Sequence, residues 1–186
     1  MNNGYTNHSG GALGADTYWE QCGREYGVKT VAYSFGNHSS KSPSLRVLKL
    51  DELAEGWEAV KSVSKDIGRN LPYQKYVQNL LSRNWFQVKN SEAVFAISKL
   101  NRSTFKNVEG GTGWAVQMAI KHQKPVFLFD QLEKKWYIYN TESGLFTEID
   151  YIPTLTQNFA GIGSRELTVS GMAAIDSVYK ETFKDG

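Results

Sequence analysis

Residues 157–166 read Gln157-Asn158-Phe159-Ala160-Gly161-Ile162-Gly163-Ser164-Arg165-Glu166, a stretch that passes from an apolar segment through two glycines into a predicted helix over 166–183. Glycines let a backbone turn sharply and approach a ligand, and the free N–H groups at the start of a helix favour anions. Ser164 is a candidate N-cap of that helix, and Arg165 would place a forked cation beside an anion. The stretch is therefore typical of a phosphate-binding turn.

Two further stretches of this kind occur upstream. They read Ser9-Gly10-Gly11-Ala12-Leu13-Gly14-Ala15-Asp16 and Glu109-Gly110-Gly111-Thr112-Gly113-Trp114. Each follows a predicted strand and precedes a predicted helix, so we call 9–16, 109–114 and 161–166 the first, second and third glycine turns. Because the turns that follow parallel strands meet at one edge of a sheet, we predict one shared site.

Three residues of these turns each allow two interpretations. Asp16 is either a first-turn acid that binds backbone donors or a contact to a ribose hydroxyl or other ligand group. Trp114 either packs in the core or stacks on a base. Arg165 either binds the ligand or forms a structural salt bridge.

Composition limits the classes of function. The chain has 186 residues and a formal charge of +2, which favours one globular domain over 1–186 with a sizeable core and argues against a nucleic-acid partner. A single cysteine, Cys22, excludes an internal disulfide and a cysteine metal cluster, and His8, His38 and His122 lack the spacing of metal ligands. No apolar run is long enough to cross a bilayer and no signal peptide is recognisable, so we expect a cytoplasmic protein without a membrane partner.

Hydrophobic periodicity predicts strands that alternate with helices, which indicates a three-layer α/β fold of Rossmann type with a mostly parallel sheet. The strand at 156–160 is expected near the centre, between the strands that contain Tyr5 and Ala93. Helices predicted at 51–69 and 73–88 form an insertion over 51–88, and their apolar faces assign them to packing. Residues 135–149 predict a β-hairpin that is appended to the parallel core.

The motifs S-G-G-A-x-G-A-D, G-G-T before the helix that leads to K-P-V-F-L-F-D, and A-G-x-x-S-R-E together resemble the SLOG superfamily, which includes DprA-like, LOG-like and YpsA-like domains. In most members the G-S-R turn follows the first strand, whereas here it comes last. The order is similar to that of the circularly permuted YpsA-related branch, parts of which are described as molybdenum-cofactor carriers. The resemblance covers most of the chain apart from 51–88 and the hairpin, and it implies nucleotides or their derivatives as ligands.

One residue bears on catalysis. The LOG-type phosphoribohydrolases carry P-G-G-x-G-T-x-x-E, with the glutamate placed to act on the ribosyl bond, and this chain has Gln117 at the corresponding position. An amide cannot exchange a proton near neutral pH or stabilise an oxocarbenium ion by charge. We therefore predict binding without turnover and assign no catalytic residue, although Glu109, Asp16 and Glu166 remain candidate carboxylates.

The resemblance implies a non-catalytic binder of a phosphorylated, nucleotide-derived molecule, with no metal or other cofactor required. Such a protein would act as a sensor, or as a phage-type sponge in anti-defence that sequesters an immune signal such as a cyclic ADP-ribose derivative or a cyclic oligonucleotide. The alternatives are a LOG-like hydrolase or transferase of nucleotide N-glycosidic bonds and a molybdenum-cofactor carrier. Superfamily members often dimerise through helices beside the site, so a homo-oligomer is expected. The residues predicted to bind the ligand are Ser9, Gly10, Gly11, Asp16, Gly110, Gly111, Thr112, Gly113, Trp114, Gly161, Gly163, Ser164 and Arg165.

Overall fold

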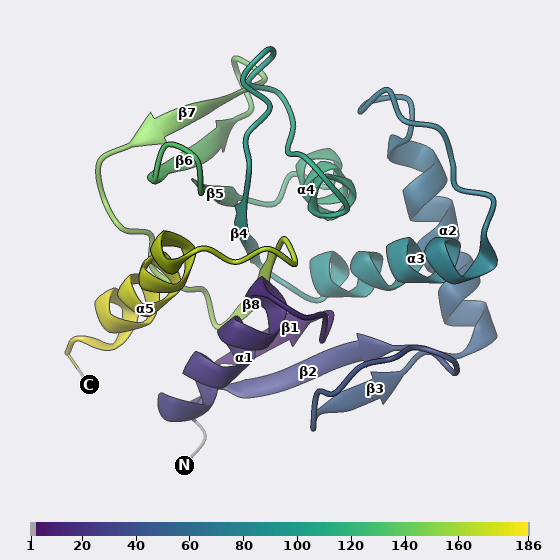
Figure 1. Cartoon of the computed structure of the whole chain (residues 1–186), viewed down its shortest axis with the longest axis horizontal. Coiled ribbons are helices and arrows are strands. Elements are labelled where there is room, and N and C mark those ends of the chain that lie inside the picture. The colour runs from purple at the N-terminus through teal and green to yellow at the C-terminus, as the bar shows by residue number, and fades with distance from the viewer. Residues whose placement is uncertain (1–2, 186) are drawn as a thin grey trace.

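The computed structural model describes residues 3–185, which form a three-layer α/β fold with one mixed sheet between two layers of helices (Figure 1). The strand order across the sheet is β3-β2-β1-β8-β4-β5-β6-β7. The strands are β1 (Thr6–Ser9), β2 (Lys29–Ser34), β3 (Leu45–Val47), β4 (Ala93–Ser98), β5 (Val126–Asp130), β6 (Lys135–Asn140), β7 (Leu145–Ile149) and β8 (Asn158–Gly163). The helices are α1 (Ala15–Glu25), α2 (Leu50–Val63), α3 (Lys75–Lys89), α4 (Thr112–Lys121) and α5 (Val169–Phe183).

Strand β8 occupies the middle of the sheet, as the sequence predicts. It pairs in parallel with β1 on one side and with β4 on the other, so that Phe159 lies opposite both Asn7 and Ala93. The pairs β1–β2, β2–β3 and β4–β5 are also parallel. The strands β1, β2, β3, β4, β5 and β8, which these pairs join, therefore end at the same edge, and the glycine turns that follow β1 and include the end of β8 lie there.

The helices cover both faces of the sheet, with α1 and α5 on one side and α2, α3 and α4 on the other (Figure 1). A hydrophobic core lies on each face of the sheet, and β4 contributes to both because its side chains alternate between the faces. Val94 and Ala96 pack with α2, α3 and α4, whereas Phe95 and Ile97 pack with α1 and α5. The unbroken apolar run of this strand is thus that of a strand buried on both faces.

The insertion 51–88 folds as two crossed helices. Helix α2 ends at Val63, earlier than predicted, and α3 follows after a loop. The two helices approach closely at Gly56, where an added Cβ would overlap the backbone of Ser82. Trp57 and Trp85 are partly buried against the core, as expected for packing helices, but α3 also contacts β1 and β8 and so reaches the glycine turns.

The predicted start and N-cap of the last helix, α5, are wrong. It begins at Val169 rather than at Glu166, and Thr168 is its N-cap, with an Oγ1 that accepts a hydrogen bond from the Gly171 N–H at 3.0 Å. Ser164 instead donates to the Glu166 carbonyl. A tertiary contact explains where the helix begins. Gln131, just after β5, accepts hydrogen bonds from the Thr168 N–H and hydroxyl and so fixes Thr168 as the N-cap.

The hairpin is confirmed, since β6 and β7 pair in antiparallel fashion over residues 135–149. It is not separate from the core, because β6 also pairs with β5 and continues the same sheet. Between residues 3 and 185 no helix combines the length and apolarity that crossing a membrane requires.

Candidate functional site

The first and third glycine turns pack against each other at the end of the sheet. Gly14 has a φ of 94°, and a Cβ on it would overlap the backbone carbonyls of Ser164 and Arg165. The Ala15 N–H donates to the Ser164 carbonyl at 3.1 Å, and the Ser164 N–H donates to the Ile97 carbonyl at 2.9 Å. A glycine at position 14 is therefore required by another part of the protein rather than by a ligand.

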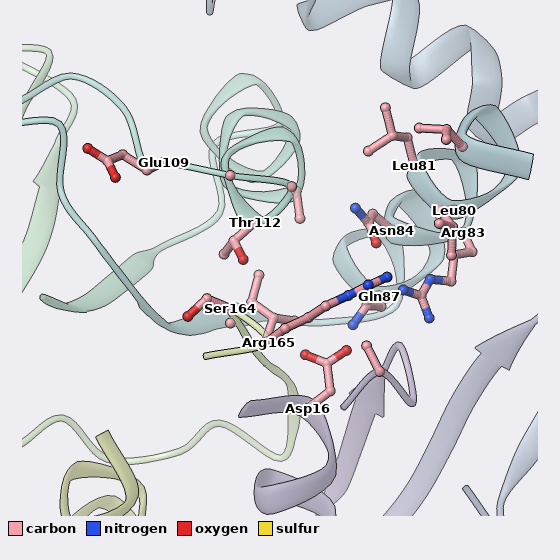
Figure 2. A pocket seen from close by; sticks show the side chains of 17 residues that line it. Asp16, Leu80, Leu81, Arg83, Asn84, Gln87, Glu109, Thr112, Ser164 and Arg165 are labelled. Carbon is pink, nitrogen blue, oxygen red and sulfur yellow. The ribbon is translucent and has the colours of Figure 1, made fainter. Parts of the chain in front are cut away.

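The second glycine turn faces this pair across a cavity of about 400 Å³, which we call the first cavity (Figure 2). Helix α3 forms the remaining wall. The lining residues are Ala12 and Asp16 from the first turn, Glu109, Gly110, Gly111, Thr112 and Ala115 from the second turn and α4, Ile162, Gly163, Ser164 and Arg165 from β8 and the third turn, and Val77, Leu80, Leu81, Arg83, Asn84 and Gln87 from α3.

Just over half of the predicted ligand-binding residues line this cavity. The seven that do are Asp16, Gly110, Gly111, Thr112, Gly163, Ser164 and Arg165, and the six that do not are Ser9, Gly10, Gly11, Gly113, Trp114 and Gly161.

In the first turn, the residues away from the cavity bind other parts of the protein. The Ser9 hydroxyl donates to Glu20 at 2.7 Å and accepts from the Gly11 N–H. The Gly10 carbonyl accepts from the Arg83 guanidinium, and the Gly11 carbonyl accepts from the Ser40 hydroxyl. The polar groups that the sequence assigned to a ligand are thus used internally here.

The other three serve packing. Trp114 is only 6% exposed and belongs to the core beneath α2, α3 and α4, which is the first of its two interpretations. A Cβ on Gly113 would overlap the Val108 carbonyl, and one on Gly161 would lie 2.6 Å from the Trp19 ring.

Helix α3 supplies cavity-lining residues that the sequence interpretation missed. Arg83, Asn84 and Gln87 reach the cavity from a helix assigned to packing alone. Arg83 and Gln87 are buried, and their four-residue spacing puts them on one helical face. Two polar residues at this spacing, next to the apolar positions Leu80 and Leu81, are the signal that could have found them.

Asp16 and Arg83 form a buried pair of opposite charges at the base of the cavity. They are 5% and 6% exposed, and both lie against Gly10, where a Cβ would be 2.7 Å from Asp16 Oδ2 and 2.8 Å from Arg83 Nη1. Burial raises the pKa of the Asp16 carboxyl to about 6, and the Arg83 charge opposes that rise. Within residues 3–185, neither Asp16 Oδ1 nor Arg83 Nε has a hydrogen-bond partner.

Arg165 is exposed, and its side chain extends across the cavity towards α3 (Figure 2). Arg46 and Arg102 form ion pairs with carboxylates, but in the described part of the chain Arg83 and Arg165 have no carboxylate oxygen within 4.0 Å. Burial lowers the pKa of His38 to about 4, and the charges of Arg83 and Arg165 add to that effect. The cavity is thus lined by two guanidinium groups, Arg83 and Arg165, and by two carboxyl groups, Asp16 and Glu109.

The N-terminus of α4 brings partial positive charge to the same cavity. Its N-cap, Gly111, provides no side-chain hydrogen bond, and nothing lies within 4 Å of the positions that side chains on Gly110 and Gly111 would occupy. Backbone N–H groups at such an open helix end are available to an anion.

Of the two other candidate carboxylates, Glu109 and Glu166, only Glu109 lines the first cavity. Gln117 is half-buried and lines neither this cavity nor the one described below, whereas Glu109 lines both. Across residues 3–185 no group of three or more His, Cys, Asp or Glu side chains is placed to hold a metal ion.

Comparisons of the chain with protein-family models, with curated proteins and with solved structures found no match.

Proposed function

We propose that this protein binds a phosphorylated, nucleotide-derived small molecule in the first cavity and does not transform it. Arg165 is the main support, because this exposed guanidinium lines the cavity and forms no ion pair in the described chain, and the buried Arg83 adds a second guanidinium to the same cavity beside Asp16. A guanidinium matches the geometry of phosphate oxygens, and hydrogen bonds between charged groups are roughly twice as strong as those between neutral groups.

The α4 N-terminus completes the anion site. A helix end contributes about 0.3–1 kcal/mol to a nearby anion when exposed, and up to about 2 kcal/mol when partly buried. Gly110, Gly111 and Thr112 place that end opposite Arg165. A phosphate between them would meet positive charge from both sides.

The α3 wall suits the rest of a nucleotide. Val77, Leu80 and Leu81 offer an apolar surface to a base or a sugar, while Asn84 and Gln87 can donate and accept hydrogen bonds. A volume of about 400 Å³ is within the usual size of small-molecule sites, roughly 300–1,000 Å³.

Membership of the permuted SLOG branch is part of the proposal. Its support is that β8, followed by the G-S-R turn, lies centrally between β1 and β4 although it comes last among the strands. In that setting the protein would act as a sensor or as a sponge that sequesters a nucleotide immune signal. A homo-oligomer remains a prediction; Tyr73 and Tyr76 are the exposed aromatic side chains of the insertion that could serve it.

Cleavage of a nucleotide N-glycosidic bond is the second candidate function. Asp16 favours it, because a buried carboxyl group that lines the cavity and has a pKa of about 6 can exchange a proton near neutral pH. Gln117, the counterpart of the LOG-type catalytic glutamate, is away from the cavity and supports neither function.

Thermal-shift screening against nucleotides, cyclic oligonucleotides, ADP-ribose isomers and molybdopterin, followed by mass spectrometry of each stabilising compound, tests these functions. We expect a compound that raises Tm and is recovered intact, with the shift lost in Arg165→Ala. Arg24→Ala is the matched control, because Arg24 is an exposed arginine at the far end of α1. Release of a free base or of ribose phosphate would reject binding without turnover and support cleavage of the N-glycosidic bond. Stabilisation by molybdopterin alone would favour a molybdenum-cofactor carrier.

A further inference from the structure

A second cavity of about 300 Å³ adjoins the first. Its wall consists of Ser98, Lys99, Glu109, Gly110, Gln131, Ser164, Arg165, Glu166 and Thr168. Glu109, Gly110, Ser164 and Arg165 line both cavities, so the two spaces meet along the second and third glycine turns. A ligand group held by Arg165 would therefore lie between them.

The two cavities differ in chemistry. The first has an apolar wall that includes Val77, Leu80, Leu81 and Ile162, whereas no lining residue of the second carries an apolar side chain. An apolar wall favours the flat faces of a base, whereas the carboxylate, amide, hydroxyl and ammonium groups among the lining residues of the second cavity can form hydrogen bonds with a polar group. The two spaces thus suit the two ends of one asymmetric molecule.

The wall of the second cavity is held by a fixed hydrogen-bond network. Gln131 is buried, and its amide donates to the Ser164 hydroxyl at 3.2 Å and to the Glu166 carbonyl at 2.9 Å. Its amide oxygen accepts from the Thr168 N–H at 2.8 Å and from the Thr168 hydroxyl at 2.9 Å. This saturated side chain joins β5 to the third turn and the start of α5, so the polar wall is formed before any ligand arrives.

The charges of this wall fit hydroxyl groups better than further phosphates. Glu109 and Glu166 are exposed carboxylates that can accept hydrogen bonds from hydroxyls and would repel a terminal phosphate. Lys99 is an exposed cation that forms no ion pair within residues 3–185, and it can bind a phosphate near the boundary. The arrangement places anion-binding groups at the boundary and hydroxyl acceptors beyond it.

We infer that the ligand is a nucleoside diphosphate that carries a sugar, with the base in the first cavity, the phosphates beside Gly110 and Arg165, and the sugar hydroxyls against Glu109 and Glu166 in the second cavity. This inference rests on the proposed function and names the class of ligand for the same site.

Isothermal titration with matched pairs tests it: ADP with ADP-glucose, GDP with GDP-mannose, and UDP with UDP-glucose. Within the pair whose diphosphate binds best, we expect the sugar form to bind about tenfold more tightly, as two or three added hydrogen bonds would give. Glu166→Ala should reduce this ratio to about two and leave the diphosphate affinity unchanged. Its side chain forms no hydrogen bond or ion pair in the part of the chain described, so the fold should persist.

Asn84→Ala is the matched control from the first cavity, and it should weaken both members of a pair equally and leave the ratio unchanged. A diphosphate that binds no less tightly than its sugar form in the wild type would overturn the inference and leave the proposed function standing. The inference would be overturned in the same way if the ratio survived in both Glu166→Ala and Glu109→Ala, the two residues assigned to the sugar hydroxyls. If none of the diphosphates or sugar forms binds but another nucleotide derivative raises Tm in the thermal-shift screen, the inference is overturned and the proposed function stands. If no phosphorylated compound binds the folded protein, the proposed function itself fails.

Discussion

The first and third glycine turns are both rich in glycine and lie against each other, yet their residues have different contacts. In the first turn, Arg83, Ser40 and Glu20 engage the residues that a phosphate would otherwise contact. In the third turn, Arg165 extends into the cavity without a carboxylate partner in the described chain. A glycine-rich turn therefore indicates that another group approaches the backbone closely. Only the surrounding structure shows whether that group belongs to the protein or to a ligand.

The largest effect should come from Gly14, which joins the two turns. Gly14→Ala places a side chain at a φ of 94° and against the carbonyls of Ser164 and Arg165, so we expect the free energy of unfolding to fall by about 3 kcal/mol or more. Chemical denaturation measures it. Gly36→Ala is the control, because nothing lies within 4 Å of its added Cβ, and a comparable loss there would show that the contact between turns is not the cause.

Matched substitutions of the two arginines should separate structure from binding. Arg83→Met leaves the Gly10 carbonyl and the buried Asp16 without their cation, and should lower the free energy of unfolding by about 1–3 kcal/mol. Arg165→Met should change stability by less than about 0.5 kcal/mol, since the side chain is exposed. It should weaken binding of the phosphorylated ligand about 10–100-fold by loss of charge-assisted contacts. Equal effects of the two substitutions on stability would remove the distinction between the turns.

The smallest effect concerns pH. Asp16 has a pKa of about 6 in the free protein, so it is mostly ionised at pH 7.5 and mostly protonated at pH 5. A bound phosphate nearby would raise that pKa further, because two negative charges repel. The ionised carboxylate opposes binding at high pH and the protonated carboxyl does not, so affinity should rise about threefold to tenfold as pH falls through 6.

Titration with UDP-glucose or ADP-glucose, whichever binds, measures this dependence, because their diphosphate groups do not titrate in that range. His38 stays neutral throughout, since its pKa is about 4. Asp16→Asn should abolish the dependence and keep the tighter affinity at every pH. A dependence that persists in Asp16→Asn would assign it to another group.

Much of the fold could be predicted because it depends on local patterns. The apolar run of β4 predicts a strand buried on both faces, and the change of period at 135–149 predicts the hairpin. The start of α5 could not be predicted, because the Thr168 cap is fixed by Gln131 from a strand that is distant in the sequence.

Sequence motifs predicted only those cavity-lining residues that belong to the glycine turns. Gly110, Gly163 and Arg165 follow from the turn motifs, and they line the cavity. Arg83 and Gln87 could not be predicted from a motif. The periodicity of a helix shows which of its faces is buried, but it does not show whether that face packs in a core or lines a cavity. Gly161 shows the reverse error, because the glycine is needed to fit the Trp19 ring.

The central place of β8 has a consequence for how the protein is made. Strands β3, β2 and β1 form one half of the sheet and β4 to β7 the other, and β8 is the strand that joins them. Because β8 follows every other strand of this sheet in the sequence, the edges of β1 and β4 stay unpaired until β8 is synthesised, and these contacts between distant parts of the sequence form late and slowly. The third glycine turn follows β8, so the cavity that it lines is complete only when the sheet is complete.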